Sequence, residues 1–269
     1  MNPHQEANRR RWDELVPIHA ASAFYDVVAF KSGRCTLRSI ELAELGDVAG
    51  KSLLHLQCHF GLDTLSWARR GARVTGVDYS EVAIAQASAL AAENGVEATF
   101  VCSRVEDLPT VLHGKFDIVF TSYGVLCWLP ELKPWANTIA HCLKPGGVFY
   151  MVEIHPFVDV LDDSAGVTEL SIRYPYFHHA EPLAWDAVGT YADRSATVVN
   201  KISHVWSHGL GEIVSALLDE GLRLEYLHEW PECIVQRFPF MIRDADGWWR
   251  FPARMPVLPQ MFSLRAKNG

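Results

Sequence analysis

Short apolar runs alternate with stretches of helical spacing between residues 51 and 154. Runs long enough for buried strands lie at Lys51–Gln57, Ala72–Val77, Glu97–Val101, Lys115–Ser122 and 148–154. Helical spacing of the apolar residues occurs at Leu62–Arg70, 81–94 and Glu131–Cys142. Strands that alternate with helices pair in parallel and are covered on both faces. The pattern therefore predicts an α/β fold with a doubly wound, mostly parallel sheet.

The ends of these helices carry recognisable signals. Gly71 follows the first helix, and Ser80 precedes the second as a candidate N-cap. Gly95 ends that second helix, because glycine readily adopts the left-handed conformation of a helix C-terminus.

After Pro156 the alternation stops, and residues 156–206 are rich in Tyr, Phe, His and Trp. The segment Thr197–Trp206 is a candidate arm of a hairpin. The strand and helix pattern then resumes, with Ser207 as the expected cap of a helix that reaches Glu220. An insert near the carboxyl edge of a sheet is a common position for a substrate cap.

The whole chain of 269 residues is expected to form a single domain with four parts. These are an N-terminal helical segment (1–49), a cofactor-binding half (50–155), a substrate cap insert (156–206) and the C-terminal part of the sheet (207–269). The N-terminal segment either packs as a helical layer on the sheet edge or forms a lid over the ligand. Tyr25, in one of its aromatic stretches, is a candidate cofactor contact.

The composition narrows the functional classes. With 49% hydrophobic and 21% charged residues, the chain is globular, and its formal net charge of −8 disfavours binding to a phosphate backbone. No apolar run reaches the roughly 18 residues that a membrane span requires. Six cysteines without a C-x-x-C pair indicate reduced thiols. We therefore expect a cytoplasmic protein that does not bind membranes and is unlike a nucleic-acid-binding protein.

The first strand leads into a turn that differs from a dinucleotide-binding turn. Such a turn needs glycines so that its backbone can approach a pyrophosphate, but here Gln57 and His59 carry side chains and only Gly61 remains. This argues against NAD or FAD and favours a ligand without phosphate. Asp78 ends the second strand, where an acid commonly binds ribose hydroxyls. Asp63 either stabilises its helix N-terminus or meets an ammonium group.

Four sequence blocks occur in order: "LLHLQCHFG" with "GARVTGVDYSEVAIAQA", then "FVCSRVEDLP", "FDIVFTSYGVLCWL" and "LKPGGVFYMVE". Together they resemble the class I S-adenosylmethionine-dependent methyltransferases, of the type that acts on small molecules. The resemblance covers about residues 50–155. It implies a seven-stranded sheet of order 3-2-1-4-5-7-6 whose last strand, "MFSLRA", is antiparallel. Two departures are His55, where an acid is common, and the side chains of the turn.

The resemblance also assigns roles to particular residues. The turn would lie under the methionine part of S-adenosylmethionine, Asp78 would bind the ribose, and Ser122 with Tyr123 would border the sulfonium. The implied cofactor contacts are Gln57, Cys58, His59, Gly61, Asp63, Asp78, Tyr79, Val105, Glu106 and Ser122, with Tyr79, Val105 and Glu106 at the adenine.

Methyl transfer at a sulfonium carbon needs mainly alignment and desolvation of the acceptor. An acceptor amine or hydroxyl can also need a base, which points first to a histidine. His155, after the fifth strand, is the leading candidate, and its alternative role is that of a hydrogen-bonded structural histidine. Tyr123 is the second candidate catalytic residue. Glu153 is expected to be structural or to contact the cofactor.

Histidine pairs raise the question of a metal site. The spacing His204-x3-His208 would place two ligands on one helix, but Ser207 and Gly209 indicate that a helix begins between them. The pair His178-His179 raises the same question. No metal site is expected.

The predicted activity is methyl transfer to a nitrogen or oxygen atom of a small molecule held under the aromatic and histidine-rich cap. Aromatic walls would suit a cationic or planar acceptor. The alternatives are a protein or RNA methyltransferase and a non-catalytic protein that binds S-adenosylmethionine. The oligomeric state is left open.

Overall fold

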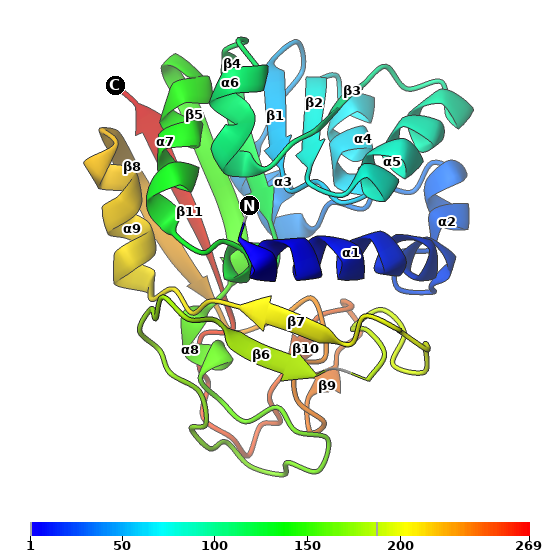
Figure 1. Cartoon of the computed structure of the whole chain (residues 1–269), viewed down its shortest axis with the longest axis vertical. Coiled ribbons are helices and arrows are strands. Elements are labelled where there is room, and N and C mark those ends of the chain that lie inside the picture. Colours follow the sequence, from blue (N-terminus) through cyan, green and yellow to red (C-terminus); the bar gives the residue numbers. More distant parts are fainter. Residues whose placement is uncertain (1, 187) are drawn as a thin grey trace.

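The computed structural model describes residues 2–186 and 188–269. Within them, seven strands form one sheet in the order β3-β2-β1-β4-β5-β11-β8 (Figure 1). The strands are β1 (Ser52–Leu56), β2 (Arg73–Asp78), β3 (Thr99–Cys102), β4 (Phe116–Ser122), β5 (Leu143–Ile154), β8 (Leu222–Trp230) and β11 (Met261–Asn268). Strands β1 to β5 pair in parallel, whereas β11 is antiparallel to β5 and β8. The predicted order and the antiparallel last strand are confirmed.

The helices are α1 (Pro3–Ala21), α2 (Val27–Lys31), α3 (Ser39–Leu45), α4 (Leu62–Arg69), α5 (Glu81–Glu93), α6 (Leu108–Val111), α7 (Leu132–Cys142), α8 (Pro156–Asp159) and α9 (Leu210–Asp219), with short 3-10 turns η1 (Val105–Asp107) and η2 (Leu126–Trp128). Ser80 caps α5 as predicted, since its hydroxyl accepts a hydrogen bond of 3.0 Å from Ala83 N. The cap predicted at Ser207 is wrong. Helix α9 begins at Leu210 with Gly209 at its N-cap.

The central strands are apolar on both faces because helices cover both sides of the sheet. In β5, Phe149 and Met151 belong to the core that contains α7 and α9. Their neighbours Tyr150 and Val152 belong to the opposite core, with α3 and α4. All four side chains are fully buried. Alternate residues of one strand thus anchor two separate layers, which fixes the register of the sheet.

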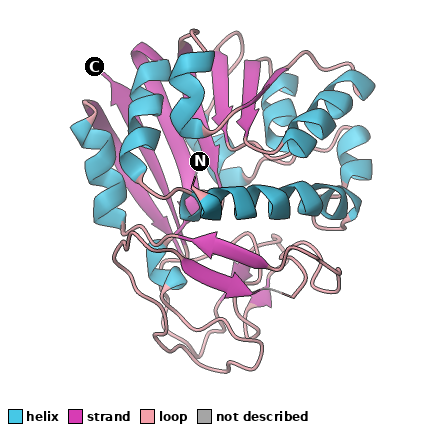
Figure 2. Ribbon diagram, viewed as in Figure 1, coloured by secondary structure: helices cyan, strands magenta, loops and turns pink. Residues whose placement is uncertain are grey.

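Helix α1 crosses the carboxyl ends of the strands and lies between the sheet and the insert formed by residues 156–206 (Figure 1). The insert is mostly loop (Figure 2) but contains an antiparallel hairpin of β6 (Leu183–Asp186) and β7 (Ile202–Val205), so the expected hairpin arm is confirmed over part of its length. Asn8 of α1 joins the two parts: its Nδ2 donates to His204 O at 2.7 Å, and its Oδ1 accepts from His204 N at 2.8 Å.

Two further short strands, β9 (Ile242–Arg243) and β10 (Trp249–Arg250), pair in the long loop before β11. Buried side chains of this loop, Phe238 and Trp248 among them, extend the core that contains α3 and α4. In Figure 1 this loop lies at the same end of the sheet as the insert.

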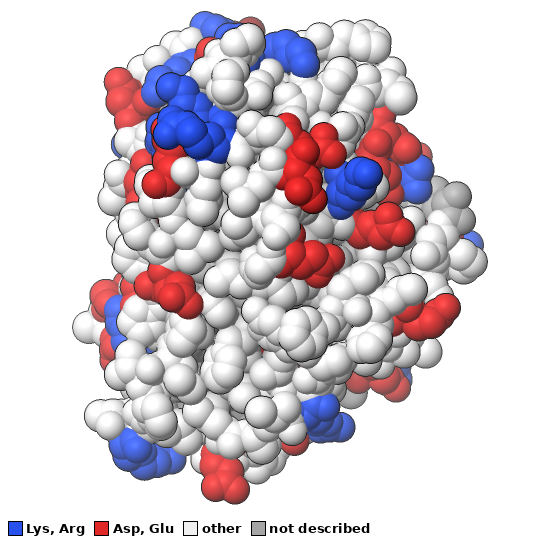
Figure 3. Space-filling model, turned by 90° about the vertical axis from the view of Figure 1, so that its left-hand side faces the viewer, with Lys and Arg blue, Asp and Glu red and all other residues white. Residues whose placement is uncertain are grey.

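The surface carries charges of both signs. On the face shown in Figure 3, Lys and Arg side chains lie in small separate groups among acidic ones. None of the helices in the described part of the chain is long and apolar enough to cross a membrane.

Candidate active site

The turn after β1 adopts an unusual backbone conformation. Gln57 and His59 have φ angles of 54° and 51°, and Gly61, the N-cap of α4, has a φ of 80°. Left-handed conformations cost a residue with a side chain about 1–2 kcal/mol, and such strain is concentrated at functional sites. At Gly61 a Cβ atom would come within 2.8 Å of the Phe100 ring. Two side chains thus occupy positions where glycine is favoured, and the one remaining glycine is sterically required.

Asp78 holds this turn against the end of β2. Its Oδ2 accepts a hydrogen bond of 2.8 Å from His59 N, and its Oδ1 accepts one of 2.9 Å from Ser80 N. Burial raises the pKa of the Asp78 carboxyl, although the two amide donors favour its ionised form. Each carboxylate oxygen can accept more than one hydrogen bond, so both retain capacity for a ligand hydroxyl.

An aromatic and histidine cluster, which we call the aromatic cluster, lies over the turn. It consists of Trp12, His19, Tyr25, His59 and Tyr191. His19 Nδ1 is 3.0 Å from His59 Nε2, and the Tyr25 and Tyr191 hydroxyls are hydrogen-bonded. The rings of His19 and Tyr25 stack with centroids 5.3 Å apart, and Trp12 meets His59 edge-on at 5.2 Å. The cluster brings together the N-terminal segment, the turn and the insert.

Burial controls the charge of the two histidines. It lowers the pKa of His19 to about 4 and that of His59 well below its ordinary value. Both rings are therefore uncharged at neutral pH, and one must donate the shared proton to the other. The remaining nitrogen, His19 Nε2, is buried and has no hydrogen-bond partner within the described residues.

A buried carboxyl faces the residue that follows β4. Tyr123 has a φ of 31°, and its hydroxyl donates to Glu41 Oε2 at 2.7 Å. Glu41, on α3, also accepts from Arg38 N at 2.6 Å and has no exposed surface. Burial raises the pKa of Glu41 to about 7, and the pKa of the Tyr123 phenol lies well above 10 for the same reason. This pair can hold or release a proton near neutral pH.

Asp63 and Ser122, predicted from separate segments, are neighbours. Asp63 Oδ1 accepts from the Thr36 hydroxyl at 2.5 Å, and Ser122 Oγ lies 3.5 Å from Asp63 Oδ2. Ser122 Oγ is also 3.3 Å from His55 Nε2. Burial raises the pKa of Asp63 and lowers that of His55 to about 3. His55, which stands where an acid is common, is thus an uncharged member of a buried polar chain.

The predicted adenine contacts lie at the amino end of α1. Glu106 Oε1 accepts from Gln5 Nε2 at 2.9 Å and borders a cavity of about 180 Å³ whose lining also includes Trp135. Val105 is buried, and its carbonyl oxygen accepts from Thr138 Oγ1 at 2.9 Å. This end of the site is therefore open enough to admit part of a ligand.

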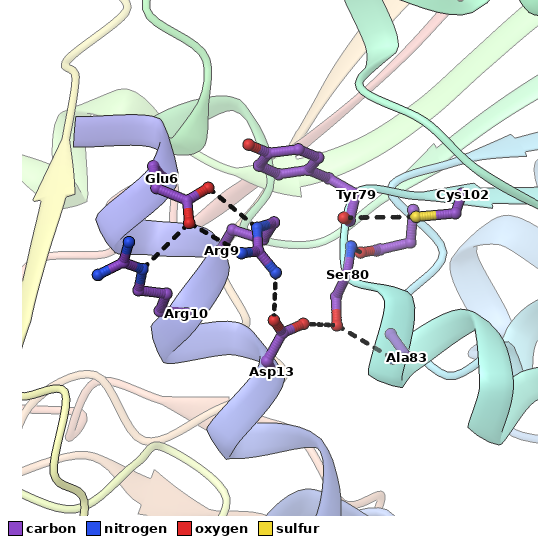
Figure 4. Close-up of polar contacts among 9 residues, drawn as sticks. Glu6, Arg9, Arg10, Asp13, Tyr79, Ser80, Ala83 and Cys102 are labelled. Atoms are coloured by element: carbon purple, nitrogen blue, oxygen red, sulfur yellow. Dashed lines mark hydrogen bonds and ion pairs between the residues drawn. The ribbon is translucent and has the colours of Figure 1, made fainter. Parts of the chain in front are cut away.

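Polar contacts join α1 to the end of β2 (Figure 4). Ser80 Oγ donates to Asp13 Oδ1 at 2.6 Å, and Asp13 Oδ2 accepts from Arg9 at 2.6 Å. Glu6 pairs with Arg9 at 2.8 Å, which lowers the pKa of Glu6 to about 2. In Figure 4 the ring of Tyr79 lies beside the Arg9 guanidinium. Helix α1 is thus joined to the end of β2 by the hydrogen bond between Ser80 and Asp13, while the ion pairs lie within α1 and orient Asp13.

The acids and histidines after β5 have other partners. Glu153 accepts from the backbone amides of Gly124, Val125 (2.8 Å) and Leu126 (3.3 Å), so it shapes the loop after β4. His155 is the N-cap of α8: its Nδ1 accepts from Phe157 N at 3.0 Å.

The second nitrogen of His155, Nε2, lies 3.0 Å from Glu229 Oε1 on β8. Burial lowers the pKa of His155, and the nearby Glu229 carboxylate opposes this effect. Both ring nitrogens of His155 therefore face α8 and β8. Tyr123 and the turn after β1 face the N-terminal segment instead.

The structure gathers most predicted residues at one edge of the sheet and adds several that sequence reasoning missed. The added residues are Trp12, His19, Thr36, Glu41 and Tyr191. They lie in segments interpreted only as a helical lid and a cap. Glu41 sits in a helical pattern next to apolar residues, and its complete burial is visible only in three dimensions.

Known proteins resemble the chain over the region that contains this site. The profile of a methyltransferase domain family matches residues 53–147. An uncharacterized methyltransferase of Synechocystis sp. is 34% identical over 124 residues, which cover 46% of this chain and 56% of that protein. A ubiquinone biosynthesis O-methyltransferase of Chromobacterium violaceum is 36% identical over 104 residues, 38% of this chain and 44% of the relative. The chain thus spans about half the length of the curated relatives it matches.

A solved S-adenosylmethionine-dependent methyltransferase of Mesorhizobium loti shares the fold, with a TM-score of 0.60 and 20% identity over 88% of this chain and 99% of that one. At this identity the similarity shows a shared fold only. The similarity in sequence comes from the methyltransferase domain matched at residues 53–147. With the strand order, these similarities show that residues 53–147 form a methyltransferase domain, on the fold of the S-adenosylmethionine-dependent methyltransferases.

Proposed function

We propose that the chain transfers the methyl group of S-adenosylmethionine to a nitrogen or oxygen atom of a small molecule bound beside the aromatic cluster. The observation that carries the proposal is the turn after β1, whose left-handed residue His59 donates its backbone amide to Asp78 within the matched methyltransferase domain. Similarity to O-methyltransferases of ubiquinone biosynthesis supports a small acceptor.

The polar atoms around the turn fit the amino-acid end of this cofactor. Gln57 Nε2 donates to Val125 O at 3.0 Å, but Gln57 Oε1 is buried without a hydrogen-bond partner in the described residues, as is His19 Nε2. A buried unsatisfied polar atom costs about 1–3 kcal/mol, so a ligand that pairs it is favoured. Gln57 and Asp63 would hold the ammonium group.

The adenosine end has its own candidate partners. The spare acceptor capacity of Asp78 would take the ribose hydroxyls, while Tyr79, Val105 and Glu106 would border the adenine. These assignments place the cofactor along the carboxyl ends of β1, β2 and β4, where doubly wound sheets commonly bind ligands.

When bound, S-adenosylmethionine supplies an electrophilic methyl group on a positively charged sulfur. The residues of the chain align the acceptor and exclude water, because Trp12, Tyr25 and Tyr191 surround the turn with aromatic rings. His19 and His59 are uncharged at neutral pH and so do not repel a cation.

The proton of an acceptor hydroxyl or ammonium group needs a destination. Glu41 supplies one, since a base with a pKa of about 7 is effective at neutral pH and the Tyr123 hydroxyl lies 2.7 Å from its carboxylate. His155, predicted as a base from the sequence, is the alternative. Its contacts with Phe157 and Glu229 make it the less favoured of the two.

Calorimetric titration with S-adenosylhomocysteine tests the cofactor assignment. Wild-type chain should bind one equivalent, and Asp78→Ala should weaken binding by at least about tenfold, equivalent to about 1.4 kcal/mol. Asp219→Ala, an exposed acid at the end of α9, serves as the matched control and should bind like the wild type. A melting curve of each variant separates lost binding from lost folding. Failure of the wild type to bind would refute the assignment.

Transfer itself is tested by uptake of a labelled methyl group into a panel of small amines, phenols and other hydroxyl compounds. Product formation that depends on Glu41 supports the proposal. Uptake restricted to RNA or protein would support the competing substrate classes. Cofactor binding with no transfer to any acceptor would instead indicate a non-catalytic binding protein.

A further inference from the structure

A cluster of two histidines and a glutamate lies where the insert meets α9 and includes none of the residues proposed to bind the cofactor. His178 comes from the insert, His208 precedes α9, and Glu212 lies in the first turn of α9. One ligand atom from each residue lies within 4.8 Å of the others. His204 is on β7, so the useful spacing is His208-x3-Glu212 and not the His204-x3-His208 pair considered from the sequence. We propose that these three side chains bind a zinc ion.

The hydrogen bonds of His208 prepare it as a ligand. Its Nε2 lies 2.8 Å from the carbonyl oxygen of Leu129, which can only accept, so Nε2 carries a proton. Nδ1 is then the nitrogen free to bind an ion, and it lies 3.2 Å from Glu212 Oε1. Either a proton on Nδ1 or a bound cation can join this nitrogen to the carboxylate, and the third ligand atom, from His178, favours the cation. A carbonyl bonded to the far ring nitrogen is also the usual outer contact of a metal-bound histidine.

His178 brings an unused nitrogen to the same place. Its Nδ1 is buried and has no hydrogen-bond partner within residues 2–186 and 188–269. Its ring lies parallel to that of His208, with centroids 5.0 Å apart and planes 9° apart. Coordination would satisfy this nitrogen, which the protein alone leaves unpaired.

The surrounding backbone already holds the segment of His178 against α9. The Tyr176 hydroxyl accepts from Leu210 N at 3.0 Å, and a Cβ added at Gly209 would approach the Tyr176 ring to 2.8 Å. Trp206 Nε1 donates to Ala180 O at 3.2 Å. The ligand atoms are therefore brought together by independent contacts, so they need little rearrangement to bind an ion.

The donor set selects the metal. Imidazole nitrogens with one carboxylate suit zinc, which accepts three protein ligands and keeps the fourth position for water. The ion would join the insert to α9. His208 also lines a small cavity of about 50 Å³ with Gly124 and Glu153, so the junction lies beside the loop that follows Tyr123. This inference does not depend on the proposed methyl transfer.

Zinc binding is measured by calorimetry on the full chain, without a histidine tag and after treatment with a chelator, using zinc chloride as the only added ligand. One zinc per chain should bind, and the melting temperature should rise with zinc concentration. His178→Ala and Glu212→Gln should each weaken binding at least tenfold. These half-buried positions are used because His208→Ala removes a buried side chain that contacts Leu129.

His179→Ala is the matched control, since it removes an exposed histidine next to His178, and it should bind zinc like the wild type. Absence of saturable uptake by the wild type would overturn the proposal and leave His208 and Glu212 as an ion pair only. Equal loss in His179→Ala and His178→Ala would likewise overturn it, because zinc would then bind elsewhere on the surface.

Discussion

Replacing Glu41 by Gln tests whether the buried carboxyl beside Tyr123 titrates near neutral pH. The substitution keeps the shape of the side chain and an acceptor oxygen for Arg38 N or the Tyr123 hydroxyl, while it removes the ionisable group. Its effect on stability should depend strongly on pH, because burial raises the pKa of Glu41 from 4.5 to about 7.

The sign follows from proton linkage. A carboxyl whose pKa is raised by folding binds more protons in the folded state, so the free energy of unfolding falls as pH rises from about 4.5 through about 7. At full ionisation the loss is about 3 kcal/mol, and the part that falls between pH 5 and pH 8.5 is about 2.5 kcal/mol. Glu41 is fully buried, so solvent screening does not reduce this figure substantially.

Urea denaturation at pH 5 and pH 8.5 measures the effect as a difference between proteins. The wild type should lose about 2.5 kcal/mol of unfolding free energy from pH 5 to pH 8.5 through Glu41, and Glu41→Gln should not show this loss. The comparison does not depend on the absolute stability of the variant. Glu97→Gln, the same change at an exposed position, should track the wild type at both. If the difference in unfolding free energy between Glu41→Gln and the wild type is the same at both pH values within about 0.5 kcal/mol, the carboxyl does not titrate in this range. Glu41 could then not act as the proposed base.

Three further substitutions test the local structure by denaturation. Gly61→Ala should destabilise the protein by more than about 2 kcal/mol, because the added Cβ clashes with the Phe100 ring at an already unfavourable φ. Gly50→Ala is the control: Gly50 has a φ of 73° and open space around it, so the protein should lose only about 1 kcal/mol. Equal losses of stability in the two variants would show that the Cβ at position 61 does not clash with Phe100. Ser80→Ala should cost about 1–2 kcal/mol as a lost helix cap, and Ser88→Ala within α5 should be nearly neutral. Tyr123→Phe should cost about 1–2 kcal/mol by unpairing a buried carboxyl, yet change affinity for S-adenosylhomocysteine less than about twofold; a large loss of affinity would place the hydroxyl on the cofactor.

The sequence by itself determined the strands and helices and the edge of the sheet that we propose as the ligand site. Strand runs such as Lys115–Ser122 and helix signals such as Ser80 depend on local periodicity and capping, which neighbouring residues encode. The turn at 57–61 and Asp78 were identified for the same reason, since each directly follows a strand whose position was clear. The strand order came from the resemblance to a family, because periodicity does not specify which strands are neighbours.

The tertiary structure alone decided which distant side chains meet. Tyr123 contacts Glu41 across 82 positions of the chain, and His19 contacts His59 across 40. The partner of His208 came from the insert, where aromatic and polar residues follow no period. An apolar pattern reports which face of an element is buried, but not what packs against it. Those contacts depend on how α1 and the insert cover the carboxyl edge, and their packing leaves no periodic signal in the sequence.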